Sequence, residues 1–233
     1  MLNKIFQKLA NNYQFNSFAN KIRRKRFKYF LNVISFLHNQ KKNKIRILDI
    51  GGTQKFWEMM QAVNLPIEIV ILNLFKEDVK YNNIISVVGD AINLSQFKDR
   101  EFDIVFSNSV IEHLSNLENQ KLMANEVLRV GHNFFIQTPN YFFPIEPHFG
   151  FPFFHFLPRN VRIFLLMNFS LGWYKKTKNA DEAAKLVDEI NLLRFEELKN
   201  LFPNSFVIRE KIFGLTKSFV VVNQQVKEII FNG

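Results

Sequence analysis

The sequence predicts an α/β protein built on a mostly parallel sheet, with helices on both faces and an antiparallel pair of strands near the C-terminus. From Lys44 onward, apolar runs rich in β-branched residues alternate with segments whose apolar residues recur at helical spacing. Strands that alternate with helices form a parallel sheet with right-handed crossovers. Two later β-rich runs, 206–213 and 217–223, are separated by only three residues, so we expect them to pair as antiparallel neighbours.

The elements follow one another in a regular order. Strands are predicted at 45–50, 67–72, 84–88, 102–106 and 133–137, ahead of the antiparallel pair. Helices are predicted at 54–63 and 116–130, because their apolar residues share one face. That face holds Phe56, Met59, Met60 and Val63 in the first helix, and Leu117, the stem of Lys121, Ala124 and Leu128 in the second.

The composition excludes several classes of protein. A chain of 233 residues with 47% hydrophobic residues can bury a full core, and it contains no cysteine, which excludes disulfides, thiolate metal sites and a cysteine nucleophile. Its apolar clusters are too short for a membrane span, since Pro152, Pro158 and Arg159 interrupt the longest of them. No secretory signal is evident near Met1. We therefore expect a cytoplasmic protein.

The net charge of +10 comes from the N-terminal part of the chain. Twelve Lys or Arg residues and no Asp or Glu lie between Met1 and Arg46, whereas the remainder holds 19 basic and 21 acidic residues. The chain is thus divided into a basic helical arm, 1–43, and a main domain, 44–233, which contains a Phe/Pro-rich insertion for substrate or lid at about 139–190.

The arm has three interpretations. Its apolar residues recur at helical spacing, and basic residues stand between them. Such a helix packs on the domain through its apolar face, or binds an anionic membrane at the inner surface, or binds nucleic-acid phosphate. Membrane contact through 1–43 is favoured over RNA. One apolar set comprises Phe27, Phe30, Leu31, Ile34 and Leu37.

A glycine turn follows the first predicted strand. The run 45–50 contains Asp49 and leads into Gly51, Gly52 and Thr53. Ligands of open α/β sheets bind outside the carboxyl ends of the strands, where glycine lets backbone N–H groups approach them closely. Gly and Thr are also ordinary residues of a strand-to-helix turn, so this turn alone leaves both interpretations open.

Four motifs together carry a resemblance to a known family. They span roughly 44–140, and they are Ile47–Gly52, Val88–Ala91, Phe102–Leu114 and Glu126–Val130. In order and spacing they resemble the class I S-adenosylmethionine-dependent methyltransferases, in particular the small-molecule branch called type 11. The resemblance implies a Rossmann-like, seven-stranded sheet, S-adenosylmethionine as cofactor, and methyl transfer to a small-molecule, glycan or lipid-linked acceptor.

The resemblance also implies which residues contact the cofactor. Asp49 would anchor the turn or, through water, the amino group of the cofactor, and Asp90 would accept a hydrogen bond from the adenine amino group. A Gly-Asp pair is also common in ordinary turns, so the alternative for Asp90 is a structural role in the turn. The implied cofactor-binding set is Asp49, Gly51, Gly52, Thr53, Asn73, Leu74, Asp90, Ala91, Ser107 and Asn108.

Two departures from the family pattern keep a non-catalytic interaction protein, at a membrane or RNA surface, as an alternative. Thr53 and Lys55 stand where the family has its second and third glycines. Asn73 stands where the family commonly has an acidic residue for the ribose hydroxyls, and an amide lacks the stronger charge-assisted bond. The cofactor has no pyrophosphate, so the lost glycines do not exclude binding.

The candidate catalytic residues are Glu146 and His148, which follow the fifth predicted strand beside two prolines. A base is needed when the acceptor is a hydroxyl, whereas positioning suffices for a more acidic acceptor. A structural role in an aromatic cluster is the alternative for His148 and for His155. The helical spacing at 161–166 indicates a lid or an apolar acceptor pocket.

No metal site is expected, because Glu112-His113 lacks a second histidine at helical spacing. An RNA methyltransferase is a further alternative, and nucleic acid is less favoured as a partner because the basic excess lies in the arm rather than around the predicted pocket. The sequence leaves open the acceptor, its methylated atom and the oligomeric state.

Overall fold

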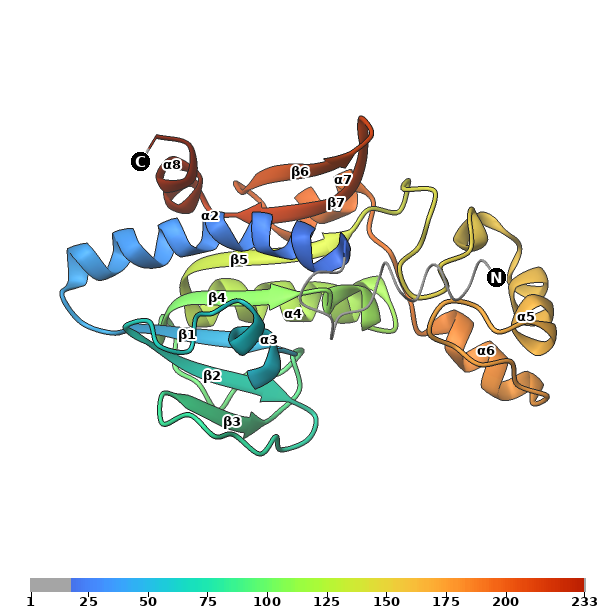
Figure 1. The fold of residues 1–233 in the computed structure, drawn as a ribbon, viewed down its shortest axis with the longest axis horizontal. Helices are drawn as coiled ribbons and strands as arrows, with labels where there is room; N and C mark the ends of the chain where they lie inside the picture. The colour runs from blue at the N-terminus through green and yellow to red at the C-terminus, as the bar shows by residue number, and fades with distance from the viewer. Residues whose placement is uncertain (1–17, 233) are drawn as a thin grey trace.

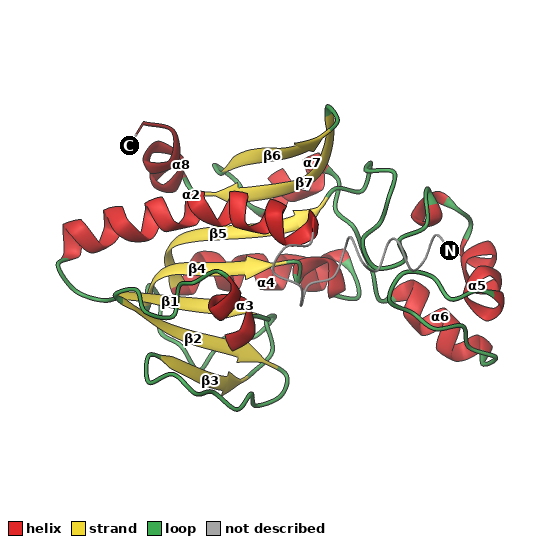
Figure 2. Cartoon of the chain, viewed as in Figure 1, coloured by secondary structure: helices red, strands yellow, loops and turns green. Residues whose placement is uncertain are grey.

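The computed structural model describes residues 18–232, which form a seven-stranded mixed sheet in the order β3-β2-β1-β4-β5-β7-β6 (Figures 1 and 2). Strands β1 to β5 are parallel, and β7 runs antiparallel between β5 and β6. The strands are β1 (Ile45–Ile50), β2 (Ile67–Asn73), β3 (Ile84–Val88), β4 (Phe102–Asn108), β5 (Gly131–Pro139), β6 (Phe206–Ile212) and β7 (Leu215–Val222). The predicted fold class is confirmed.

Helices cover both faces of the sheet. Helices α2 (Phe18–Lys41), α3 (Gln54–Met59) and α8 (Gln224–Asn232) pack on one face, and α4 (Leu117–Val130) and α7 (Phe195–Leu201) pack on the other. Two short 3-10 helices, η1 (Ile111–His113) and η2 (Phe154–Phe156), lie in the connections. No helix within residues 18–232 has both the length and the apolar character that a membrane span requires.

Helix α2 belongs to the core of the domain. Phe27 and Phe30 pack edge-on or tilted against Trp57 of α3 and Phe106 of β4, with ring centroids 4.7–6.3 Å apart. Aromatic pairs in these geometries stabilise a core beyond the area that they bury. The apolar face of α2 is therefore covered by the sheet. Its buried apolar residues are Phe27, Phe30, Val33, Ile34 and Leu37.

Several boundaries differ from the predicted ones. Strand β5 is longer at both ends than predicted, because β4 and β7 pair with it over almost its whole length. Helix α3 ends at Met59 rather than at residue 63, since Gln61 adopts a left-handed backbone conformation with φ of 57°. The part of the predicted arm before Phe18 lies outside the described residues.

Helix α4 buries a different face from the one predicted. Leu117 is 51% exposed, whereas Gln120 is buried, because its amide donates to the carbonyls of Ile111 and Asn191 at 3.1 and 2.8 Å. A polar side chain can enter the core when its hydrogen bonds are satisfied there. The buried residues of α4 are Gln120, Met123, Ala124, Val127 and Val130.

The insertion between β5 and α7 forms a small layer of its own. It contains α5 (Arg159–Asn168) and α6 (Ala180–Asp188), which lie beyond the end of the sheet toward which β1 and β4 point (Figure 1). Its separate core comprises Phe149, Phe154, Leu166, Leu171, Ala183 and Val187. The insertion thus stands next to the carboxyl ends of the parallel strands, where open α/β sheets bind their ligands.

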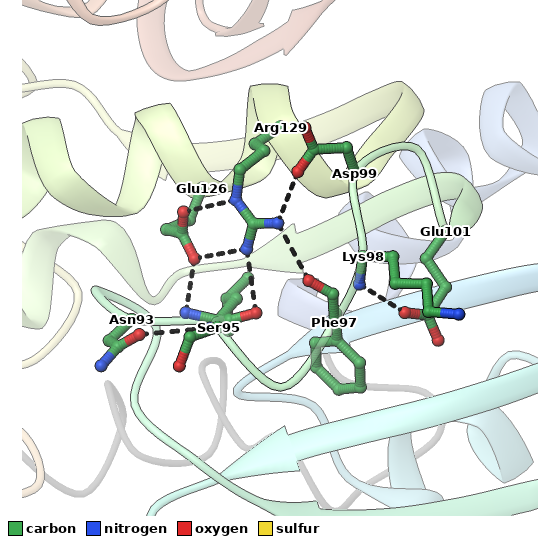
Figure 3. Close-up of polar contacts among 9 residues, drawn as sticks. Asn93, Ser95, Phe97, Lys98, Asp99, Glu101, Glu126 and Arg129 are labelled. Atoms are coloured by element: carbon green, nitrogen blue, oxygen red, sulfur yellow. Dashed lines mark hydrogen bonds and ion pairs between the residues drawn. The ribbon is translucent and has the colours of Figure 1, made fainter.

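Arg129 of α4 holds the loop that follows β3 (Figure 3). Its guanidinium pairs with Glu126 and Asp99 at 2.8 Å and donates to the carbonyls of Leu94 and Phe97 at 2.9 Å. Glu126 accepts in turn from the backbone N–H of Leu94. One arginine therefore replaces the regular hydrogen bonds that this irregular loop lacks, and it fixes the path of the chain after β3.

We expect Arg129→Met to lower the free energy of unfolding by about 1–3 kcal/mol, because two backbone carbonyls lose a donor while the apolar stem is kept. Urea denaturation measures this change. Lys121→Met, at an exposed position of the same helix, should leave the midpoint nearly unchanged. Equal effects of the two substitutions would mean that the loop does not depend on the guanidinium.

Candidate active site

The turn after β1 requires both of its glycines. Gly51 has φ of +70°, and a Cβ there would lie 2.5 Å from Cγ2 of Val110. A Cβ on Gly52 would lie 1.7 Å from Oδ2 of Asp49, which is closer than any real contact. The N–H of Gly51 donates to the carbonyl of Leu72 at 2.8 Å, so the turn is also tied to β2. Only glycine lets the backbone close directly over the Asp49 carboxyl group.

Asp49 is a buried carboxyl group with one unused oxygen. Its side chain is 1% exposed, and Oδ2 accepts from Nε1 of Trp57 at 2.7 Å. Within residues 18–232, Oδ1 has no hydrogen-bond partner. Burial, with a smaller effect from the charge of Glu77, raises the pKa of Asp49 to about 8, against the opposing effect of the Trp57 hydrogen bond. An unpartnered buried acceptor beneath a glycine turn fits a ligand that brings a donor.

The end of β2 supplies an amide and a carboxylate. Asn73 donates from Nδ2 to the carbonyl of Gly52 at 2.7 Å, and Glu77 accepts from the N–H of Gln54 at 3.2 Å. Sequence reasoning did not select Glu77, because it lies four residues after Asn73 in an irregular loop. The structure nevertheless brings a carboxylate to the glycine turn, where the sequence pattern indicated none.

Asp90 lies beside Asn73 at the ends of the neighbouring strands, because the N–H of Gly89 donates to the carbonyl of Asn73 at 2.9 Å. The carboxyl group is exposed and accepts from the N–H of Ile92 at 3.2 Å, while Ala91 is buried. Leu74 is 74% exposed next to this pair. The structure thus brings Asn73, Leu74, Asp90 and Ala91 to one edge of the sheet.

Ser107 and Asn108 end β4 in different environments. Ser107 is fully buried and donates from Oγ to the carbonyl of Ile50 at 3.2 Å, so its side chain ties β4 to β1. Asn108 accepts from Nη1 of Arg26, a residue of α2. A side chain from the basic arm therefore reaches the edge of the candidate site, which the position of Arg26 in the sequence did not reveal. Thr53 accepts from the N–H of Phe56 at 3.2 Å and caps α3.

Glu146 and His148 form a pair in the insertion. The Glu146 carboxylate is buried and accepts from the backbone N–H groups of His148 and Phe149 at 2.8 and 2.9 Å. Its other oxygen lies 2.5 Å from Nδ1 of His148. Burial lowers the pKa of His148, but the hydrogen bond and the charge of Glu146, with Glu112 and Glu189, raise it above the ordinary histidine value overall. The pair fixes the imidazole, with Nδ1 toward Glu146.

Glu112 and His113 lie beside this pair. Thr138 donates to Oε2 of buried Glu112 at 3.0 Å, and Oε1 has no partner within residues 18–232. Burial raises the pKa of Glu112 to about 7 and lowers that of His113 to about 4. The His113 ring stands edge-on to the His148 ring, with centroids 4.7 Å apart. Both residues lie within the sequence motif Phe102–Leu114, but the sequence did not single them out as site residues.

His155 donates from Nε2 to the carbonyl of Tyr141 at 2.8 Å and packs on aromatic rings, which supports a structural role. No group of three or more His, Asp or Glu residues within 18–232 has an arrangement that could hold a metal ion.

Comparisons with known proteins identify part of the chain. Residues 48–135 match the family model described as "Methyltransferase domain". This match confirms the family resemblance carried by the four sequence motifs. A stretch of 54 residues is 39% identical to the "Uncharacterized protein Rv1509" of Mycobacterium tuberculosis; it covers 23% of this chain and only 18% of that relative.

Several solved structures resemble this chain at low sequence identity. The PH0226 protein of Pyrococcus horikoshii OT3 superposes with a TM-score of 0.51 at 16% identity, over 94% of this chain and 97% of its own. An S-adenosylmethionine-dependent methyltransferase of Methanosarcina mazei gives a TM-score of 0.47 at 13% identity, over 80% and 95% of the two chains. At these identities the likeness concerns the fold alone.

We expect Asp49 to make stability depend on pH. The pKa of Asp49 is about 8 in the folded protein and 3.8 ordinarily, so the folded state holds the proton more tightly than the unfolded state. The resulting contribution to the free energy of unfolding is complete below pH 3.8 and is lost as the pH rises toward 8. Asp49→Asn keeps an acceptor for Trp57 but cannot titrate. The free energy of unfolding of the wild type should therefore fall, by on the order of a few kcal/mol, across this pH range relative to the variant.

Chemical denaturation at a series of pH values measures both curves. Glu118→Gln, which removes an exposed carboxyl group from α4, is the control and should run parallel to the wild type. Parallel curves for wild type and Asp49→Asn would show that Asp49 is ionised in the folded protein.

Proposed function

We propose that this chain, which carries an S-adenosylmethionine-dependent methyltransferase domain, transfers a methyl group to a small-molecule acceptor held between the sheet edge and the insertion that joins β5 to α7. The observation that carries the proposal is the glycine turn closed over Asp49, with its unused oxygen, next to Asn73 and Asp90. The proposal includes two more specific classes of acceptor, which are glycans and lipid-linked molecules.

The residues at the strand ends fit the cofactor. The backbone of Gly51 and Gly52 would face its methionine part, with Asp49 beneath as an acceptor for the amino group directly or through water. Asn73 and Glu77 stand where the ribose hydroxyls would lie, and Asp90 would accept from the adenine amino group. When bound, S-adenosylmethionine supplies a methyl group activated by the sulfonium, so the protein mainly aligns the acceptor and excludes water.

His148 is the proposed base for an acceptor hydroxyl. Glu146 holds Nδ1, and within residues 18–232 no hydrogen bond is formed by Nε2, which is thus available to take a proton. Glu146 stabilises the imidazolium that results, as its effect on the pKa of His148 indicates. His113, with its lowered pKa, stays neutral beside it and adds no competing charge.

The described part of the arm supports a role in the domain rather than at a membrane. The apolar face of α2 is covered by the sheet, and Arg26 is 6% exposed, so neither is presented to a surface. The exposed cations of α2 are Lys21, Lys25, Lys28 and Lys41.

Cofactor binding is tested by calorimetry with S-adenosylmethionine and its demethylated product, S-adenosylhomocysteine. We expect both to bind, and Asp90→Ala to weaken them by about tenfold, since one or two hydrogen bonds worth roughly 1–3 kcal/mol are lost. Asp181→Ala, an exposed carboxylate in α6, is the control. Absence of binding to the wild type would favour the non-catalytic alternative.

The base is tested by the pH dependence of the imidazole. NMR titration should give His148 a pKa above the ordinary histidine value, and Glu146→Gln should lower it, because the amide no longer stabilises the imidazolium. Once an acceptor is known, the rise of kcat with pH should move in the same direction, and His148→Gln should lower kcat with little effect on cofactor affinity. His155→Gln is the matched control, and an equal loss of kcat there would reduce His148 to a structural residue.

A further inference from the structure

Three cations, two from α2 and one from β7, lie within electrostatic reach of one another at the carboxyl edge of the sheet. Arg26, from α2, donates from Nε to Oε1 of Glu210 in β6 at 2.9 Å and from Nη1 to Asn108 at the end of β4. Arg23 lies about one helical turn before Arg26. Lys217, in β7, lies beside the end of β5, since its carbonyl accepts from the N–H of Asn140 at 3.0 Å. The cluster therefore borders β4 and β5, next to the insertion.

The carboxylates in contact do not balance these cations. Both oxygens of Glu210 are used, one by Arg26 and the other by Oγ of Ser218 at 2.5 Å. Within residues 18–232, Lys217 Nζ makes no hydrogen bond or ion pair, and Arg23 donates from Nη1 to a neutral oxygen, Oδ1 of Asn20, at 3.2 Å. Two cations thus lie close to a third with one carboxylate among them.

The electrostatic consequences agree with this geometry. Burial, together with the charges of Arg26 and Arg23, lowers the pKa of Lys217 to about 8, against the opposing effects of Glu210 and Glu112. Burial, then Arg26, lowers the pKa of Arg23 to about 10. A group of partly desolvated cations costs free energy unless an anion joins it, and an oxyanion would form charge-assisted hydrogen bonds there.

We propose that the acceptor carries an oxyanion, a carboxylate or a phosphate, and that Lys217 and Arg23 bind it while the Glu210–Arg26–Asn108 chain positions α2. This inference rests on the proposed function and narrows its acceptor to anionic molecules. A neutral acceptor would leave the two cations without a counter-charge. The placement beside β4 and β5 puts the anion on the same side as His148, away from the adenine end at Asp90.

The experiment uses inorganic phosphate and acetate as probes of the oxyanion, titrated separately by calorimetry into the full chain with and without saturating S-adenosylhomocysteine. We expect at least one probe to bind, with the stronger one indicating which class of oxyanion the site prefers. Lys217→Met should weaken binding by about tenfold, and Lys217→Arg should restore most of it. Affinity should fall as pH rises through about 8, where Lys217 loses its proton.

Lys211→Met is the matched control, because Lys211 is an exposed residue of the same hairpin that pairs directly with Thr216. It should bind the probe like the wild type. Binding of neither probe to the wild type, or equal binding to wild type and Lys217→Met, would overturn the proposal. So would a Lys217→Met variant that weakens S-adenosylhomocysteine itself, since the cluster would then serve the cofactor. A wild type that binds a probe but not S-adenosylhomocysteine would contradict the proposed function alone.

Discussion

The contact between Asp49 and Trp57 is the constraint on which the site depends. A carboxyl group at 1% exposure needs a donor, and the indole N–H supplies one from α3 at 2.7 Å. Trp57 is itself fixed by the aromatic rings of α2 and β4, so the position of the carboxyl group is set by the core. Gly52 can then close over it, and the turn after β1 takes the shape that a ligand meets.

Helix α2 links that core to the chemistry at the sheet edge. Its apolar residues pack against the sheet, while Arg26 on its N-terminal half reaches β4 and β6. The same helix therefore provides buried aromatic area and a fixed cation. A helix held along its length by the sheet can present a charged group with little freedom to move, which favours a defined binding geometry over a loose surface contact.

The insertion is organised separately from the sheet. It has its own small core, and its polar centre is the Glu146 carboxylate, which orders the following turn through two backbone N–H groups and holds the His148 ring. One side chain thus shapes the loop and tunes the imidazole. Since the insertion connects β5 to α7, its position beside the carboxyl ends of the parallel strands follows from the topology.

The sequence by itself determined the succession of strands and helices along the chain, the glycine turn at Gly51 and Gly52, the resemblance to methyltransferases and the location of Glu146 beside His148, because these depend on periodicity or on residues close together in the chain. Tertiary structure decided which distant groups meet. Glu77 reaches the glycine turn, and Arg26 meets Glu210 across 184 residues, through packing that no local pattern encodes. Burial also set the protonation of the carboxyl groups, since desolvation depends on how the whole chain closes around them.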